Sequence, residues 1–313
     1  MMKVLITGAT GFIGANLTRR LLHDGHEVHA IIREEAQLWR LDSIITDLHL
    51  HIIDMTDSLK LTQLVREISP QWIFHLAVYG AYSSQSNVEE MVQTNVVATS
   101  NLLLACEKVG FEAFVNTGSS SEYGFKLYAP TEEESLEPNS YYAVTKASAT
   151  LFARYFSQRT QLQVVTLRLY SVYGLYEEYT RLIPRLIVNG LKGTYPPLVS
   201  PTTARDFIYT DDVVDAYLKA ADNGQIPRGA IYNIGSGQQT ELREVVELVR
   251  SQLGISEEPQ WGSMEQRIWD TNTWVANISS AKRDLDWSPT NSLDSGLRQM
   301  TAWIRTHLDV YNR

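Results

Sequence analysis

Hydrophobic positions in the first 174 residues follow two alternating patterns. Short runs rich in Val, Ile and Leu are typical of buried strands, and longer stretches with apolar residues every three or four positions are typical of amphipathic helices. The pattern predicts strands at residues 3–7, 27–32, 48–53, 72–77, 113–117 and 164–170, with helices after the first strand and at 59–68, 88–109 and 141–158. Strands separated by helices of this length predict a parallel, doubly wound sheet.

The pattern loosens after Gly174, where prolines at 184, 196, 197 and 201 interrupt it. Short strands around Phe207 and Ile231 mix with helices at 211–221, 240–253 and 293–307. We therefore expect an α/β fold with a Rossmann-type dinucleotide-binding domain over residues 1–174. Residues 175–313 are expected to form a smaller mixed α/β substrate-binding lobe, with some segments returning to the first domain.

Composition narrows the class of partner. The 313 residues are 44% hydrophobic and carry a formal net charge of −9, which argues against a nucleic-acid or membrane partner. The chain begins with a strand pattern and lacks an apolar run of membrane-spanning length, so we expect a cytoplasmic protein. Cys106 lies in an apolar run and is predicted to be a buried core thiol. His49 and His51 alternate with apolar residues and are interpreted as strand residues, so no metal site is expected.

A glycine-rich segment, Gly8-Ala9-Thr10-Gly11-Phe12-Ile13-Gly14, follows the first strand. Gly8 can adopt a positive φ, Gly11 lets another molecule approach the backbone, and Gly14 lets the next helix pack closely on the strand. The free N–H groups of that helix would then face an anion such as a pyrophosphate. An ordinary tight turn is the alternative, but the strand–turn–helix context favours a dinucleotide.

A second group of residues carries candidate chemistry. Tyr142 and Lys146 are four residues apart and share one helix face, where a cation can lower the pKa of a phenol and prepare it for general acid–base catalysis. Ser119 follows the strand that begins at Ala113, at a sheet edge where open α/β folds bind ligands. A surface Tyr–Lys pair and a serine-rich turn are the structural alternatives.

With these motifs the whole chain resembles the extended short-chain dehydrogenase/reductase family of nucleotide-sugar epimerases, dehydratases and ketoreductases. Further matches are His75-Leu76-Ala77, Asn95, Arg168 to Gly174 and Arg205 to Val213. The resemblance implies a nucleotide-diphosphate sugar as substrate and a homodimer as the assembly. It implies Ser119, Tyr142 and Lys146 as catalytic residues. It implies cofactor contacts from Gly8, Thr10, Gly11, Phe12, Ile13, Gly14, Arg33, Asp54, Met55, Leu76, Ala77, Tyr142 and Lys146, and substrate contacts from Tyr82, Ser120, Ser171, Arg205 and Arg267.

Two departures from the family pattern bear on the reaction. Ser120 and Ser121 occupy the positions where the sugar 4,6-dehydratases resemble each other in an acidic pair, so dehydration is disfavoured unless Glu122 takes that role. Ser171 replaces an asparagine that commonly contacts substrate in the epimerases, which counts against a hexose 4-epimerase of the usual type.

Arg33 ends the second strand, where an arginine can meet a 2′-phosphate, and this favours NADP(H). Glu34 or Glu35 could instead accept hydrogen bonds from a ribose, so NAD(H) remains open. We therefore expect NADPH-dependent reduction of a nucleotide-linked 4-keto-6-deoxyhexose. The alternatives are an NAD-dependent nucleotide-sugar epimerase, similar to a UDP-hexose 4-epimerase, and a non-catalytic dinucleotide-binding protein.

Overall fold

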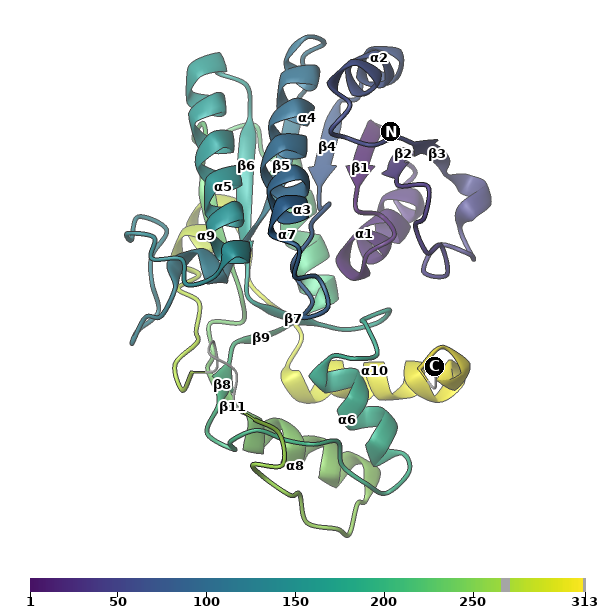
Figure 1. Cartoon of the computed structure of the whole chain (residues 1–313), viewed down its shortest axis with the longest axis vertical. Coiled ribbons are helices and arrows are strands. Elements are labelled where there is room, and N and C mark those ends of the chain that lie inside the picture. The colour runs from purple at the N-terminus through teal and green to yellow at the C-terminus, as the bar shows by residue number, and fades with distance from the viewer. Residues whose placement is uncertain (266–270, 312–313) are drawn as a thin grey trace.

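The protein consists of a sheet-containing upper lobe and a mainly helical lower lobe (Figure 1). This structure is a computed structural model, and it describes residues 1–265 and 271–311. The central sheet has seven strands in the order β10-β6-β5-β4-β1-β2-β3, and every neighbouring pair is parallel. The strands are β1 (Lys3–Thr7), β2 (Glu27–Ile32), β3 (His49–Ile52), β4 (Trp72–His75), β5 (Ala113–Ser119), β6 (Val164–Leu169) and β10 (Ile231–Ile234).

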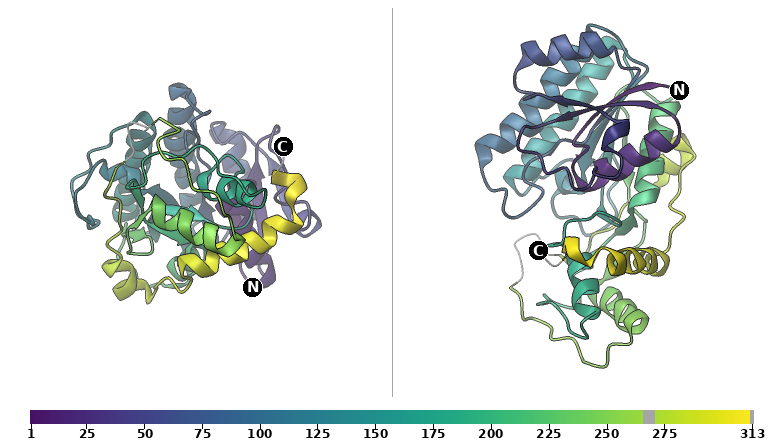
Figure 2. Two further views of the ribbon diagram at one scale, coloured as in Figure 1. Left: turned by 90° about the horizontal axis from the view of Figure 1, so that it is seen from below. Right: turned by 90° about the vertical axis from the view of Figure 1, so that its right-hand side faces the viewer.

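Helices cover both faces of this sheet, as Figure 2 shows in its right-hand view. On one face, α2 (Ser58–Ile68), α4 (Ala98–Glu107) and α5 (Tyr141–Thr160) bury side chains such as Leu64, Leu103 and Phe156. On the other, α1 (Phe12–His23), α7 (Thr210–Asp222) and α9 (Ser279–Leu285) bury side chains such as Leu17 and Val213. The predicted doubly wound α/β fold is confirmed.

The predicted helix at 88–109 is present but is not uniform. It contains α3 (Val88–Val92), a π-helical turn η2 (Gln93–Val97) and then α4. A π turn inserts one extra residue per hydrogen-bonded ring, which changes the direction of the side chains that follow it. Asn95 lies in this turn, and its side chain is 1% exposed.

The lower lobe has its own apolar core, formed by α6 (Leu182–Gly190), α8 (Leu242–Leu253), α10 (Leu293–Thr306) and α11 (Leu308–Tyr311). Two small ladders connect it to the upper lobe: β7 (Ser171–Tyr173) with β9 (Phe207–Tyr209), and β8 (Ala204–Arg205) with β11 (Thr240–Glu241). The described residues also form two 3₁₀ turns, η1 (Ile45–Asp47) and η3 (Ser120–Tyr123). Strand β10 and helices α7 and α9 return from this second half of the chain to the central sheet.

The order of the strands reverses between β1 and β4, because the chain adds β2 and β3 on one side and β5 and β6 on the other. In an open parallel sheet this switch point opens a crevice at the carboxyl ends of the strands, where ligands bind. The lower lobe faces those ends (Figure 1). Within the described ranges no helix has the length and apolar character needed to cross a bilayer, and Cys106 is buried as predicted.

Candidate active site

The glycine turn lies at the switch point, between β1 and α1. Gly8 has a φ of +72°, and a side chain there would lie 2.6 Å from the carbonyl carbon of Leu76. A methyl group at Gly14 would overlap the carbonyl oxygen of Gly8. At Gly11 an added carbon would meet only Gly8 O, at 3.2 Å, so the turn is open on this side. Helix α1 lacks a side-chain cap and first-turn carboxylates, which leaves its N–H groups available to an anion.

A buried polar relay fixes the floor of this crevice. Thr7 Oγ1 lies 2.7 Å from His75 Nδ1 and accepts the Ala77 N–H at 3.1 Å. His75 Nε2 lies 2.8 Å from Thr99 Oγ1. Burial, assisted by the charge of Lys146, lowers the pKa of His75 to about 3, so this imidazole stays neutral. The relay therefore orients Leu76 and Ala77 at the end of β4 without adding charge to the site.

Tyr142 lies in the first turn of α5, which Ser140 caps by accepting the Ala143 N–H at 3.2 Å. Burial raises the pKa of the Tyr142 phenol to about 12, while a side-chain hydrogen bond with Ser119 and the charge of Arg181 act in the lowering direction. The phenol is therefore neutral at pH 7 in the protein alone. The structure brings Ser119 and Tyr142 together, as an acid–base pair on one substrate oxygen requires.

Lys146 lies one turn further along α5 and is 4% exposed. Burial lowers its pKa to about 8, and the charge of Glu122 opposes that shift. Among the described residues its ammonium has no hydrogen-bond or ion-pair partner. A buried cation without a partner is costly unless a ligand supplies one. The open glycine turn and this ammonium together fit a dinucleotide, with the pyrophosphate at Gly11 and a ribose at Lys146.

Behind Ser119 lies a fully buried ion pair. Arg168 Nε is 2.8 Å from Glu122 Oε2, and the two side chains are 2% and 0% exposed. Glu122 Oε1 also accepts the Ser119 N–H at 2.8 Å and the Thr150 hydroxyl at 3.0 Å. Each carboxylate oxygen is thus engaged by donors from β5, β6 or α5, so Glu122 holds the end of β5 in place.

Asn95 connects two parts of the site. Its side chain accepts the Tyr79 N–H at 2.9 Å, donates to Tyr79 O at 2.8 Å and donates to Thr145 Oγ1 at 2.9 Å. The loop after β4 is therefore attached to the helix that carries Tyr142 and Lys146.

The other predicted cofactor residues also lie at the carboxyl ends of the strands. Asp54 Oδ1 accepts the N–H and hydroxyl of Thr56, and the Met55 carbonyl accepts from Asn101 at 3.2 Å, so the segment after β3 is an ordered turn. Arg33 is exposed and forms ion pairs with Glu35 at 3.4 Å and Glu90 at 3.3 Å. The contact with Glu90, which is 57 residues away, is not indicated by any local pattern.

The predicted substrate residues come from several elements. The guanidinium of Arg181 lies 6.0 Å from the ring centre of Tyr82, and both act on the pKa of Tyr142. Arg205 lies over Trp274 at 5.7 Å, and Trp274 and Ser120 line the same small cavity. The backbone N–H of Ser171 donates to Asp206 O at 3.0 Å. Arg267 lies outside the described residues. Sequence reasoning missed Arg181 and Trp274, because nothing in their local sequence marks them.

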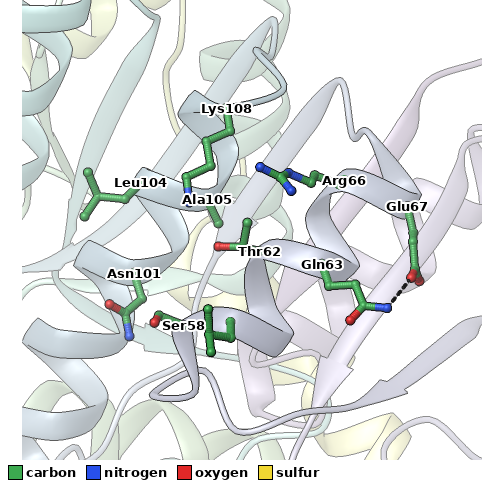
Figure 3. Close-up of a pocket in the computed structure, with 10 residues that line it drawn as sticks. Ser58, Thr62, Gln63, Arg66, Glu67, Asn101, Leu104, Ala105 and Lys108 are labelled. Carbon is green, nitrogen blue, oxygen red and sulfur yellow. Dashed lines mark hydrogen bonds between the residues drawn. The ribbon is translucent and has the colours of Figure 1, made fainter.

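A separate groove of about 740 Å³ lies between α2 and α4. Figure 3 shows its walls, with Thr62 and Arg66 on α2 opposite Asn101 on α4 and Lys108 just after α4. None of the predicted catalytic, cofactor or substrate residues lines it, so the groove is not part of the candidate active site.

The crevice, the glycine turn and the Ser119–Tyr142–Lys146 set define an α/β enzyme of the dinucleotide-binding class. The chain belongs to the NAD-dependent epimerase/dehydratase family, whose model matches residues 4–235. It is 28% identical to the UDP-glucose 4-epimerase of Mycolicibacterium smegmatis, covering 97% of this chain and 99% of the relative.

Two solved structures are similar throughout. The UDP-glucuronic acid 4-epimerase of Bacillus cereus, in complex with UDP-glucuronic acid and NAD, has a TM-score of 0.87 at 28% identity, covering 98% of this chain and 100% of its own. MoeE5 in complex with UDP-glucose and NAD has a TM-score of 0.85 at 31% identity, covering 98% and 99%.

Proposed function

We propose that the protein is an NAD⁺-dependent 4-epimerase of a UDP-linked hexose or hexuronate, and that it works without the asparagine that Ser171 replaces. The observation that carries the proposal is that both carboxylate oxygens of Glu122 already accept hydrogen bonds from neighbouring side chains or backbone. It is the only carboxylate in the turn η3 (Ser120–Tyr123) that directly follows β5, and Arg168, Ser119 and Thr150 occupy its oxygens. Dehydration needs acid–base groups in addition to the tyrosine, whereas epimerisation needs one group that removes a proton and returns it.

In this proposal, Tyr142, Ser119 and Lys146 each have a separate role in epimerisation at C4 of the sugar. NAD⁺ would supply the acceptor, and later the donor, of the hydride at C4 of the sugar. As the phenolate, which the neighbouring Lys146 ammonium would favour, Tyr142 would take the proton of the C4 hydroxyl and return it to the same sugar oxygen after the sugar has presented its other face. Ser119 would hydrogen-bond that oxygen throughout. Lys146 would hold the cofactor ribose and place a positive charge near that phenolate.

NAD⁺ is proposed in place of NADP(H) because of the surroundings of Arg33. Its guanidinium already faces the carboxylates of Glu35 and Glu90, so a 2′-phosphate there would meet two like charges. The relatives with solved complexes named above contain NAD. The same relatives contain UDP-glucose or UDP-glucuronic acid, which supports a UDP-linked sugar as the substrate.

The test uses the protein as purified, without added cofactor. UDP-glucose and UDP-glucuronic acid are incubated with it separately, and ¹H NMR follows the appearance of the C4 epimer. We expect conversion of at least one sugar, and a fall of about 10²–10⁴-fold in Tyr142→Phe. Tyr141→Phe is the matched control, because its side chain is 67% exposed on the same helix. Turnover that requires added NADPH, or no loss in Tyr142→Phe, would contradict the proposal.

We further propose that the protein is a homodimer. Large apolar side chains are exposed along α5, at Val144, Leu151 and Tyr155, and Leu104 is exposed on the neighbouring α4. Exposed apolar side chains on one helix face are typical of a protein–protein contact surface.

A further inference from the structure

Three histidines and one glutamate meet at the outer edge of the central sheet. Strands β2 and β3 run parallel, and their register pairs His29 with His49. Because side chains two residues apart in a strand lie on the same face, Glu27 and His29 from β2 share one face with His49 and His51 from β3. We call these four residues the edge cluster.

The side chains of the edge cluster are close together. One ligand atom from each of Glu27, His29 and His49 lies within 4.8 Å of the other two. His29 Nε2 is 2.9 Å from Glu27 Oε1, and His29 Nδ1 is 3.0 Å from His51 Nε2. His29 is 9% exposed, whereas His49 lies on the open side of the cluster with its ring stacked 4.6 Å from that of His29.

This donor set suits a borderline-soft metal ion. Zn²⁺ takes imidazole nitrogens and carboxylate oxygens at about 2.0–2.2 Å, which places tetrahedral ligand atoms about 3.3 Å apart. The three atoms need to converge by at most about 1.5 Å, a movement that rotation of the exposed His49 ring can supply. Free imidazoles are mostly neutral at pH 7.5 and can offer a lone pair.

We propose that Glu27, His29 and His49 form a binding site for a divalent transition-metal ion, Zn²⁺. His51 is a positioning residue, because its contact with Nδ1 of His29 fixes the ring so that Nε2 points towards Glu27. Water would complete four-coordination. Sequence spacing does not reveal this site, since His49 is 20 residues from His29 and meets it only through the strand register.

The position of the site indicates a structural role. The three metal ligands Glu27, His29 and His49 lie in the amino-terminal halves of β2 and β3, whereas the candidate active site lies at the carboxyl ends of the strands. Strand β3 has four residues and pairs only with β2, so it is the edge of the sheet. An ion bound by Glu27, His29 and His49 would join these two strands and stabilise the folded state by mass action.

The experiment uses the full chain without a histidine tag, freed of metal with a chelator. Isothermal titration with Zn²⁺ and the shift in Tm are measured for the wild type and for His49→Ala, which removes an exposed ligand. We expect one Zn²⁺ per chain, a rise in Tm on its addition, and visible d–d absorption when Co²⁺ replaces it. His49→Ala should bind Zn²⁺ at least about 10-fold more weakly and lose the rise in Tm.

Two control variants sharpen the result. His23→Ala removes a histidine whose side chain is 84% exposed on α1, and its Zn²⁺ binding should match the wild type. Lys3→Gln removes a cation 3.9 Å from Glu27, and should tighten Zn²⁺ binding. The proposal is overturned if the wild type does not bind Zn²⁺, if His49→Ala binds it as tightly as the wild type, or if His23→Ala weakens binding equally. These readouts are independent of the epimerase proposal, because they measure metal binding and Tm.

Discussion

Replacing Glu122 by glutamine tests whether its carboxylate is structural. Glutamine keeps the shape of the side chain but removes the charge that neutralises Arg168, in a place where both side chains are at most 2% exposed. Its NH₂ group would also face a donor, because Arg168, Ser119 and Thr150 all donate to this carboxylate. Removing one partner of a buried ion pair destabilises a protein by about 3–5 kcal/mol, because the other charge stays buried and unpaired.

Urea unfolding followed by tryptophan fluorescence measures this loss. With a slope of about 3 kcal/mol per molar urea, the midpoint should fall by about 1–1.7 M. Glu133→Gln is the matched control, because Glu133 is 80% exposed and its pair with Arg154 spans 3.7 Å, so its effect should stay within about 0.5 kcal/mol. Adding Arg168→Met to Glu122→Gln should restore part of the stability. Equal midpoints for Glu122→Gln and Glu133→Gln would refute the reasoning.

Three other changes have predictable outcomes. Gly14→Ala should abolish NAD⁺ retention, measured on the nucleotide released by denaturation, because its methyl group would overlap Gly8 O; retention at the wild-type level would contradict this geometry. Lys146→Met should abolish turnover and raise the Tm of the cofactor-free protein at pH 7. The lowered pKa of about 8 means that the buried ammonium destabilises the fold by about 3 kcal/mol below pH 8, an effect relieved as the pH rises towards 10.5. A lower Tm for this variant would show that the ammonium is stabilising. Leu151→Asp should give a monomer in light scattering, since it places a charge on the exposed apolar face of α5; an unchanged dimer would place the interface elsewhere.

The sequence predicted those features that depend on local pattern. Largely apolar runs identified five of the first six strands of the sheet, because strands covered by helices on both faces are mostly apolar. The edge strand β3 was indicated instead by apolar residues that alternate with His49 and His51. The glycine turn was visible for the same reason: its function depends on residues within one short segment. Ser119 and the Tyr142–Lys146 pair were predicted as catalytic residues from motifs with fixed local spacing, and the structure places Ser119 beside Tyr142.

Features that depend on contacts across the fold were not predictable. From the sequence, Arg33 was interpreted as a 2′-phosphate ligand. Its ion pair with Glu90, which argues against that role, forms only in the folded protein. Arg181 reaches the Tyr142 region from the segment before α6, and no spacing rule connects the two. The π turn at Asn95 was not predicted for a different reason. Its sequence is compatible with an ordinary α-helix, and the hydrogen bonds of Asn95 with Tyr79 and Thr145 are visible only in the folded protein.

The most direct test of the proposed function is the fate of a deuterium label at C4 of the substrate. UDP-glucose and UDP-glucuronic acid carrying deuterium at C4 are incubated with the protein as purified, in the presence of excess unlabelled NADH. If Tyr142 and Ser119 serve an epimerase that retains its NAD⁺, the C4 epimer will form with deuterium still at C4 and none in the added NADH. Deuterium in the added cofactor, or loss of the label from C4 of the product, would contradict the account.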